Sequence, residues 1–267
     1  MKRFVFFLMM MVLLSCNKVV EVSLPEYEAE MAVEMYLEEG NSLRCLLSES
    51  LPYTSLAIEK PLREALVIFS DGKSSDTLQH TRIDDWESGR WYNYAHPRIF
   101  FGDSSKTYTL TISDGKKRVL TATTRLSQRE IKIDNVVTRP SLENRDKFSV
   151  GLVITDPLAE GDYYRFLIAR SLNDYTSDVT DLYLPDISFN GQEYSLYSDA
   201  VYARNDTVMV RVYSMPEEHY NYLQTANNAR RANFNPFVQP SPVHSNITEG
   251  LGIFTILRYD ERRIVVK

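Results

Sequence analysis

The stretch Thr107–Thr124, TYTLTISDGKKRVLTATT, decides the class of fold that we expect for this chain. Its first half alternates large apolar side chains with threonines, which is typical of a strand with one buried face. Asp114-Gly115 follows, and residues 117–124 return as a second strand. Asp-Gly between two such runs predicts a tight type I′ hairpin, because that turn needs positive φ at both central residues. We therefore expect antiparallel β structure.

The same pattern continues through most of the chain, with turn signals at close intervals. Asn190-Gly191 predicts a second hairpin, between 187–189 and 194–196. Further strands are expected at 31–37, 42–47, 65–69, 98–101, 130–137, 148–155, 163–169, 207–213, 252–259 and 262–266. Short alternating strands with frequent turns are typical of β-sandwiches. We predict a mainly β protein: an immunoglobulin-like β-sandwich over residues 31–126, then a second β-rich domain over residues 127–267.

One segment departs from the β pattern. Ser214-Met215-Pro216-Glu217 is typical of a capping box with proline in the first turn of a helix. The residues that follow favour helix, with basic side chains near the end, so we predict one helix near 215–231. The proline-containing segment Asn235–Phe254 comes next. Its Gly250 and Gly252 permit close backbone approach, which predicts a fixed structural crossover.

The N-terminus has the features of a secretory signal. Two basic residues follow Met1, and an apolar run too short to span a bilayer ends at Leu13-Leu14-Ser15-Cys16. A small residue followed by cysteine at this point resembles the lipobox of bacterial lipoproteins; the alternative is an ordinary signal peptide. We predict a signal over residues 1–15, lipidation at Cys16 and a short tether over residues 16–30. Two or three acyl chains would anchor the protein stably.

Charge and cysteine content narrow the class of protein. The formal net charge is −6, which argues against nucleic acid as a partner and against a polybasic membrane-binding surface. Once Cys16 is acylated, Cys45 is left without a partner for an intramolecular disulfide. Because Cys45 alternates with Leu43 and Leu47, we expect it to be a small buried apolar residue on a strand.

No catalytic constellation is visible in the sequence. Ser70-Asp71-Gly72-Lys73 and Ser113-Asp114-Gly115-Lys116 match Ser-x-x-Lys, but each has Asp-Gly where a helix would be needed, so both predict turns. The four histidines, His80, His96, His219 and His244, have no ligand spacing. We therefore predict no enzyme activity, no cofactor and no metal site.

The most suggestive segment is Asp84–Tyr94, which holds both tryptophans of the chain. Trp86, Trp91, Tyr92 and Tyr94 lie there among carboxylates, in what the pattern predicts to be a loop. Aromatic rings beside polar groups are typical of ligand or partner surfaces. The alternative is a loop whose rings fill a gap at the sandwich edge.

Several segments occur in a characteristic order along the mature chain. They are Cys16 with Lys18, Gly102 through Tyr108–Ile112, Asp156-Pro157, Asp162–Phe166, Asp206–Val208, Asn235-Pro236-Phe237, Pro242, Ser245-Asn246-Ile247 and Gly250–Phe254. In this order they resemble a lipoprotein family of Bacteroidetes-type bacteria, the domain of unknown function number 4249. That family is often encoded near TonB-dependent outer-membrane transporters, which implies a role in uptake. It assigns no catalytic residues.

These observations lead to a functional expectation. We expect a non-enzymatic outer-membrane lipoprotein that serves as an accessory or binding subunit of a TonB-dependent nutrient uptake system. The sequence leaves open which leaflet the protein occupies. Two other classes also stay open: a surface hydrolase with a site assembled from distant residues, and an adhesin or pilus-type subunit.

Overall fold

The computed structural model describes residues 27–52, 60–86, 89–127, 129–142, 144–159, 161–170, 179–235 and 242–267. Cys16 and the predicted signal peptide lie outside these ranges. Within them the protein is mainly β with a single α-helix, α2 (Glu217–Phe234), so the predicted fold class is confirmed. None of the helical structure in these ranges is long and apolar enough to cross a membrane.

The N-terminal half contributes eight strands. They are β1 (Met31–Glu38), β2 (Ser42–Glu49), β3 (Lys60–Pro61), β4 (Leu66–Ser70), β5 (Ser75–Asp85), β6 (Arg90–Ile99), β7 (Tyr108–Ser113) and β8 (Val119–Thr124). The C-terminal half contributes the others. They are β9 (Asn135–Pro140), β10 (Lys147–Thr155), β11 (Tyr163–Ala169), β12 (Thr180–Pro185), β13 (Glu193–Tyr197), β14 (Tyr202–Ala203), β15 (Thr207–Met215) and β16 (Leu251–Val265), with a short 3-10 helix η2 (Asp186–Ser188).

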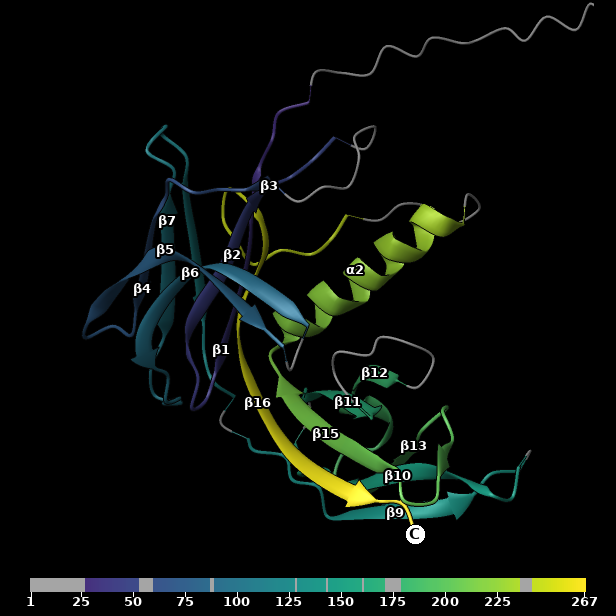
Figure 1. The fold of residues 1–267 in the computed structure, drawn as a ribbon. Helices are drawn as coiled ribbons and strands as arrows, with labels where there is room; N and C mark the ends of the chain where they lie inside the picture. Colours follow the sequence, from purple (N-terminus) through teal and green to yellow (C-terminus); the bar gives the residue numbers. More distant parts are fainter. Residues whose placement is uncertain are drawn as a thin grey trace, which may run out of the picture.

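Strand β16 connects the two halves of the fold. Its first part pairs in parallel with β1, from Ala32↔Leu251 to Glu38↔Leu257. Its second part pairs antiparallel with β15, which ends at Thr207↔Val265. The large sheet therefore runs β12-β11-β15-β16-β1-β2-β6-β5-β4-β7-β8, and Figure 1 shows β16 as the long yellow strand that joins the two units.

The two largest hydrophobic clusters of the described residues lie on either side of this junction. The first is built from alternate residues of the N-terminal strands, and Ile247, Phe254 and Ile256 from the C-terminal part complete it. The second lies between the β11–β15–β16 part of the large sheet and a smaller sheet of β13-β10-β14 with β9 on β10. Cys45 is fully buried in the first core, as its alternation with leucines predicts.

The predicted hairpin over Thr107–Thr124 is present, and its turn is longer than expected. Strands β7 and β8 pair from Tyr108↔Thr124 to Ser113↔Val119, which leaves five residues in the loop. Positive φ occurs at Gly115 and Lys117, not at two adjacent residues. The Asp114 carboxylate organises this loop, because it accepts hydrogen bonds from the backbone N–H of Lys116 and from the Arg118 guanidinium. The type I′ assignment is therefore wrong.

Other local predictions fail where a strand's partner lies far away in sequence. Asn190-Gly191 does not join two strands, because η2 precedes it and β13 pairs with β10. The two strands predicted at the C-terminus are the single strand β16. The run expected at 98–101 is the end of β6 and the residues after it.

The helix begins by a different device from the predicted capping box. Pro216 is the N-cap of α2 and makes no side-chain capping bond. Ser214 stays in β15, where its hydroxyl donates to the carbonyl oxygen of Arg129. The helix is held instead by its packing: Tyr220 contacts Tyr163, and the Tyr183 hydroxyl donates to the Leu223 carbonyl oxygen.

The crossover before β16 is closely packed at its two glycines. Part of the predicted segment, residues 236–241, lies outside the described ranges. In the rest, the Asn246 side chain both donates to and accepts from the backbone of Phe254. A Cβ at Gly250 would lie 2.9 Å from the Met31 carbonyl oxygen, and one at Gly252 would lie 1.9 Å from that of Val33. The expected close backbone approach is confirmed.

Candidate functional site

The structure separates the four aromatic residues that the sequence places in one loop. The segment belongs to the β5–β6 hairpin, so the loop prediction is wrong. Tyr94 is 1% exposed and its hydroxyl accepts a hydrogen bond from the Ala65 N–H, which makes it a core residue. Trp91 is partly buried, under the Arg82 guanidinium. Trp86 is 80% exposed in the turn of the hairpin.

Tyr92 lies in the wall of a polar cleft at the junction of the two units. The cleft has a volume of about 380 Å³. It is formed by β1, β2, β6 and the end of β5 on one side, and by β11, β15 and β16 on the other. Four arginines and four tyrosines dominate its lining: Arg44, Arg90, Arg165, Arg211, Tyr36, Tyr92, Tyr213 and Tyr259. A site with many fixed donors and acceptors is suited to recognising a polar ligand or peptide segment.

Arg44 organises the N-terminal wall of the cleft. Its guanidinium forms ion pairs with Asp85 at 3.0 Å and with Glu38 at 3.5 Å. It also lies 5.0 Å from the centroid of the Tyr92 ring. Because the residues are largely buried, these contacts hold the side chains in fixed positions.

Arg211 organises the opposite wall. It forms an ion pair with Glu261, donates to the Tyr213 hydroxyl at 2.9 Å and stacks 4.0 Å from the centroid of the Tyr259 ring. Burial alone would lower the pKa of Arg211, but Tyr213 and Glu261 outweigh burial and raise it. The Tyr259 hydroxyl donates to Glu38 across the cleft at 2.7 Å, so the two walls are tied together.

Helix α2 approaches the same junction. Its His219 is 2% exposed and lies against the ring of Tyr36, which lines the cleft. Burial lowers the pKa of His219 to about 3, and the positive charges of Arg165 and Arg90 add to this effect. The imidazole is therefore neutral at physiological pH and acts as packing.

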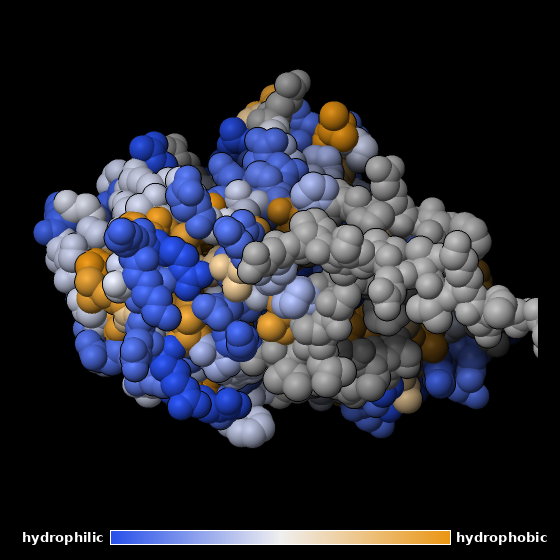
Figure 2. Space-filling view, turned by 90° about the horizontal axis from the view of Figure 1, so that it is seen from above, coloured by the Kyte–Doolittle hydropathy of each residue, from blue (hydrophilic) through white to orange (hydrophobic). Residues whose placement is uncertain are grey.

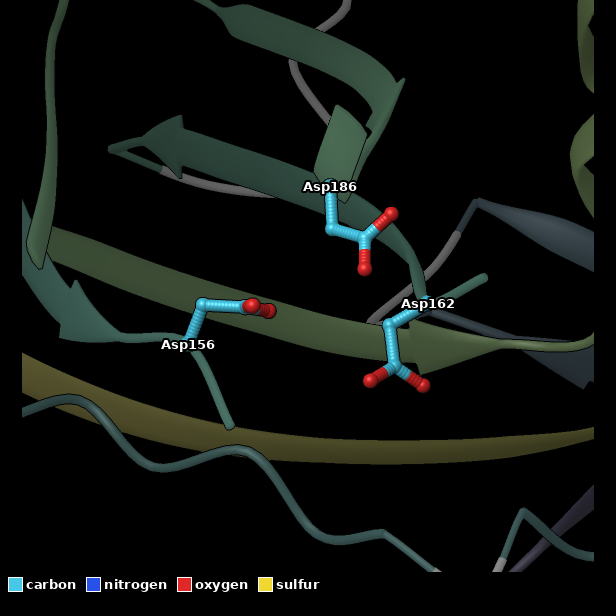
Figure 3. Close-up of side chains that lie close together, drawn as sticks. All are labelled: Asp156, Asp162 and Asp186. Carbon is cyan, nitrogen blue, oxygen red and sulfur yellow. The ribbon is translucent and has the colours of Figure 1, made fainter. Parts of the chain in front are cut away.

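A second group of clustered polar side chains lies in the C-terminal unit, away from the cleft lining. Asp156 directly follows β10, Asp162 precedes β11, and Asp186 begins η2. All three are buried, and Figure 3 shows their side chains close together. One oxygen from each lies within 4.8 Å of the others. Burial raises the pKa of Asp162; Arg129 opposes this rise, and the two neighbouring carboxylates add to it.

Sequence reasoning missed both arrangements. Asp156 and Asp162 appear among the segments that carry the family resemblance, but neither has a ligand spacing with Asp186. The cleft arginines are scattered from 44 to 211 and match no motif. Cys16, the predicted lipidation site, lies outside the described residues.

The fold and the cleft define a mainly β, β-sandwich-like protein of two units joined by one strand. The chain belongs to the family described as "Domain of unknown function (DUF4249)", which it matches over residues 17–263. Among solved structures it is similar to a DUF3823 family protein from Bacteroides uniformis ATCC 8492, at 11% identity and a TM-score of 0.31. That match covers 90% of this chain and 100% of the other. A comparison with curated proteins found no match.

Proposed function

We propose that this protein is a non-enzymatic, lipid-anchored subunit of the outer membrane that docks on a TonB-dependent transporter and assists nutrient uptake. The observation that carries the proposal is the polar cleft at the junction of the two units, with the exposed Trp86 beside it. Family membership supports the proposal, because the family that the chain resembles is often encoded near TonB-dependent outer-membrane transporters. The anchor would be a lipid on Cys16.

The composition of the cleft fits protein recognition. Tyrosine, tryptophan and arginine are the residues most enriched at the energetic centres of protein interfaces. The arginines are held by carboxylates and rings before any partner arrives, so little side-chain freedom would be lost on binding. Trp86 follows Asp85, which lines the cleft, and 80% of its surface is exposed. An indole in this position can enter a pocket on a partner.

The surface charge and hydropathy bear on the kind of partner. Figure 2 views the molecule from above relative to Figure 1. It shows hydrophilic residues over much of the described surface on this face, with hydrophobic residues in small patches. A net charge of −6 disfavours contact with a bare anionic membrane. We therefore expect the partner to be a protein whose docking loop carries both donors and acceptors.

The experiment is a mild-detergent pull-down from the native host, followed by identification of the recovered membrane proteins. We compare wild type with Trp86→Ala and with Leu142→Ala. Leu142 is an exposed apolar residue in the β9–β10 turn and serves as the matched control. We expect wild type and Leu142→Ala to recover a TonB-dependent transporter, and Trp86→Ala to recover at least about tenfold less, since an aromatic side chain that fills a partner's pocket contributes about 2 kcal/mol.

Two results would contradict this proposal. Recovery of no outer-membrane transporter by wild type would remove the accessory-subunit function. Equal recovery by a folded Trp86→Ala protein would remove Trp86 from the contact.

A further inference from the structure

The strongest unexplained feature of the molecule is the group of three buried aspartates in the C-terminal unit. Asp156, Asp162 and Asp186 are 2%, 8% and 3% exposed. Their nearest oxygens lie within 4.8 Å of one another, and Figure 3 shows the three side chains close together on separate segments. Like charges at this separation repel strongly in a site shielded from water.

The neighbouring groups described do not balance this charge. Arg129 forms an ion pair with Asp162 at 2.5 Å. Asp156 accepts neutral hydrogen bonds, from the Tyr164 hydroxyl at 2.5 Å and the Gly191 N–H at 2.8 Å. Asp186 differs from both, because its buried Oδ2 has no hydrogen-bond partner among the described residues. A buried carboxylate oxygen without a partner loses its hydration and gains no hydrogen bond that compensates for the loss.

We propose that Asp156, Asp162 and Asp186 together bind a divalent cation, and that the cation is Ca²⁺. Hard cations of this kind take carboxylate and carbonyl oxygens, and Ca²⁺ binds them at about 2.3–2.6 Å with flexible geometry. Two oxygens on opposite sides of such an ion are at most about 5 Å apart. Three oxygens no more than 4.8 Å apart lie within about 2.8 Å of a common point, so small side-chain movements bring all three carboxylates to one ion. The all-oxygen donor set disfavours zinc, which prefers nitrogen and sulfur.

The surrounding bonds suit a structural cation site. Tyr164 and Gly191 fix the orientation of Asp156 while leaving each of its oxygens a further lone pair. Asp156 follows β10 of the small sheet, whereas Asp162 and Asp186 flank β11 and β12 of the large sheet. The ion therefore ties together the two layers of the C-terminal sandwich where the chain crosses between them. This role is independent of the proposed transporter contact.

The first test measures binding directly. Protein freed of metal with a chelator is titrated with CaCl₂ by isothermal titration calorimetry, as wild type, Asp186→Asn and Asp199→Asn. Asp199 is an exposed aspartate outside the group and controls for loss of one acidic charge. We expect saturable 1:1 binding by wild type and Asp199→Asn, and at least about a tenfold weaker affinity for Asp186→Asn.

The second test measures how calcium at the same site changes the melting temperature. At a calcium concentration of about 100 times Kd, the melting temperature of wild type should rise by about 5–10 °C, because the ion binds the folded state alone. In chelator, Asp186→Asn should melt no lower than wild type, since the change removes a repulsive charge. Terbium luminescence excited through tyrosine should appear in wild type, because Tyr164 bonds directly to Asp156.

The proposal is overturned if metal-free wild type shows no saturable calcium binding and the same melting temperature in calcium and in chelator. It is also overturned if Asp186→Asn binds calcium as tightly as wild type, because the cation would then be held by other surface acids. The pull-down with Trp86→Ala tests the transporter contact and does not depend on calcium binding. Failure of either proposal therefore leaves the other testable.

Discussion

Replacing Gly252 with alanine should destabilise the junction between the two units. Gly252 pairs with Val33 in the parallel β1–β16 ladder, and its φ is +112°. An added Cβ would lie 1.9 Å from the Val33 carbonyl oxygen and 2.8 Å from the carbonyl carbon. Both neighbours are backbone atoms, so a side-chain rotation cannot relieve the overlap. β16 must move away from β1.

The structure provides a matched control for the magnitude. Gly40 also has positive φ, +80°, but a Cβ there meets no atom within 4 Å. Gly40→Ala should therefore cost only the left-handed backbone penalty of about 1–2 kcal/mol. Gly252→Ala carries a similar penalty and also loses about three ladder hydrogen bonds near the displaced backbone, at about 1 kcal/mol each. We expect a total of about 4–5 kcal/mol.

The assay is thermal and urea unfolding of the chain without the predicted signal segment. For a chain of this size 1 kcal/mol corresponds to about 2–4 °C. The melting temperature should fall by about 2–8 °C in Gly40→Ala and by about 8–20 °C in Gly252→Ala. If the two variants melted within about 3 °C of each other, the close approach of β1 and β16 would not be a determinant of stability, and the reasoning would be wrong.

Three further predictions follow from the site and the sequence. The folded pKa of His219, about 3, lies below its unfolded value of about 6.5, so the unfolded state binds the extra proton and stability falls as pH drops below about 6.5. Unfolding free energy should be about 2 kcal/mol lower at pH 5 than at pH 7.5, and His219→Phe should flatten this slope in urea titrations. Cys16→Ser should abolish incorporation of labelled fatty acid and release the protein from membranes; continued retention of lipid would disprove the anchor. Arg211→Met should weaken transporter recovery in the pull-down while Arg139→Met, at the distant β9 strand, should not; equal losses in both would point to a general effect of charge.

The segment Asp84–Tyr94 shows how local patterns can mislead. Its acidic residues, asparagine and Ser-Gly have low strand propensity, so the sequence predicts a loop. In the structure β6 pairs with both β2 and β5, and these pairings override the propensity. Tyr92 and Tyr94 then face inward because alternate strand residues share a face, whereas Trp86 lies in the turn and stays exposed.

The sequence by itself determined the mainly β class, the β7–β8 hairpin, the position of α2 to within a few residues and the burial of Cys45. These features depend on alternation, turn residues and composition, which act over a few neighbouring positions. Tertiary structure alone decided that β16 joins β1 in parallel, that the arginine and tyrosine side chains meet in one cleft, and that Asp156, Asp162 and Asp186 converge. Each of those contacts brings together segments far apart in the chain. A strand's alternation specifies which face is buried but carries no information about which strand will lie beside it.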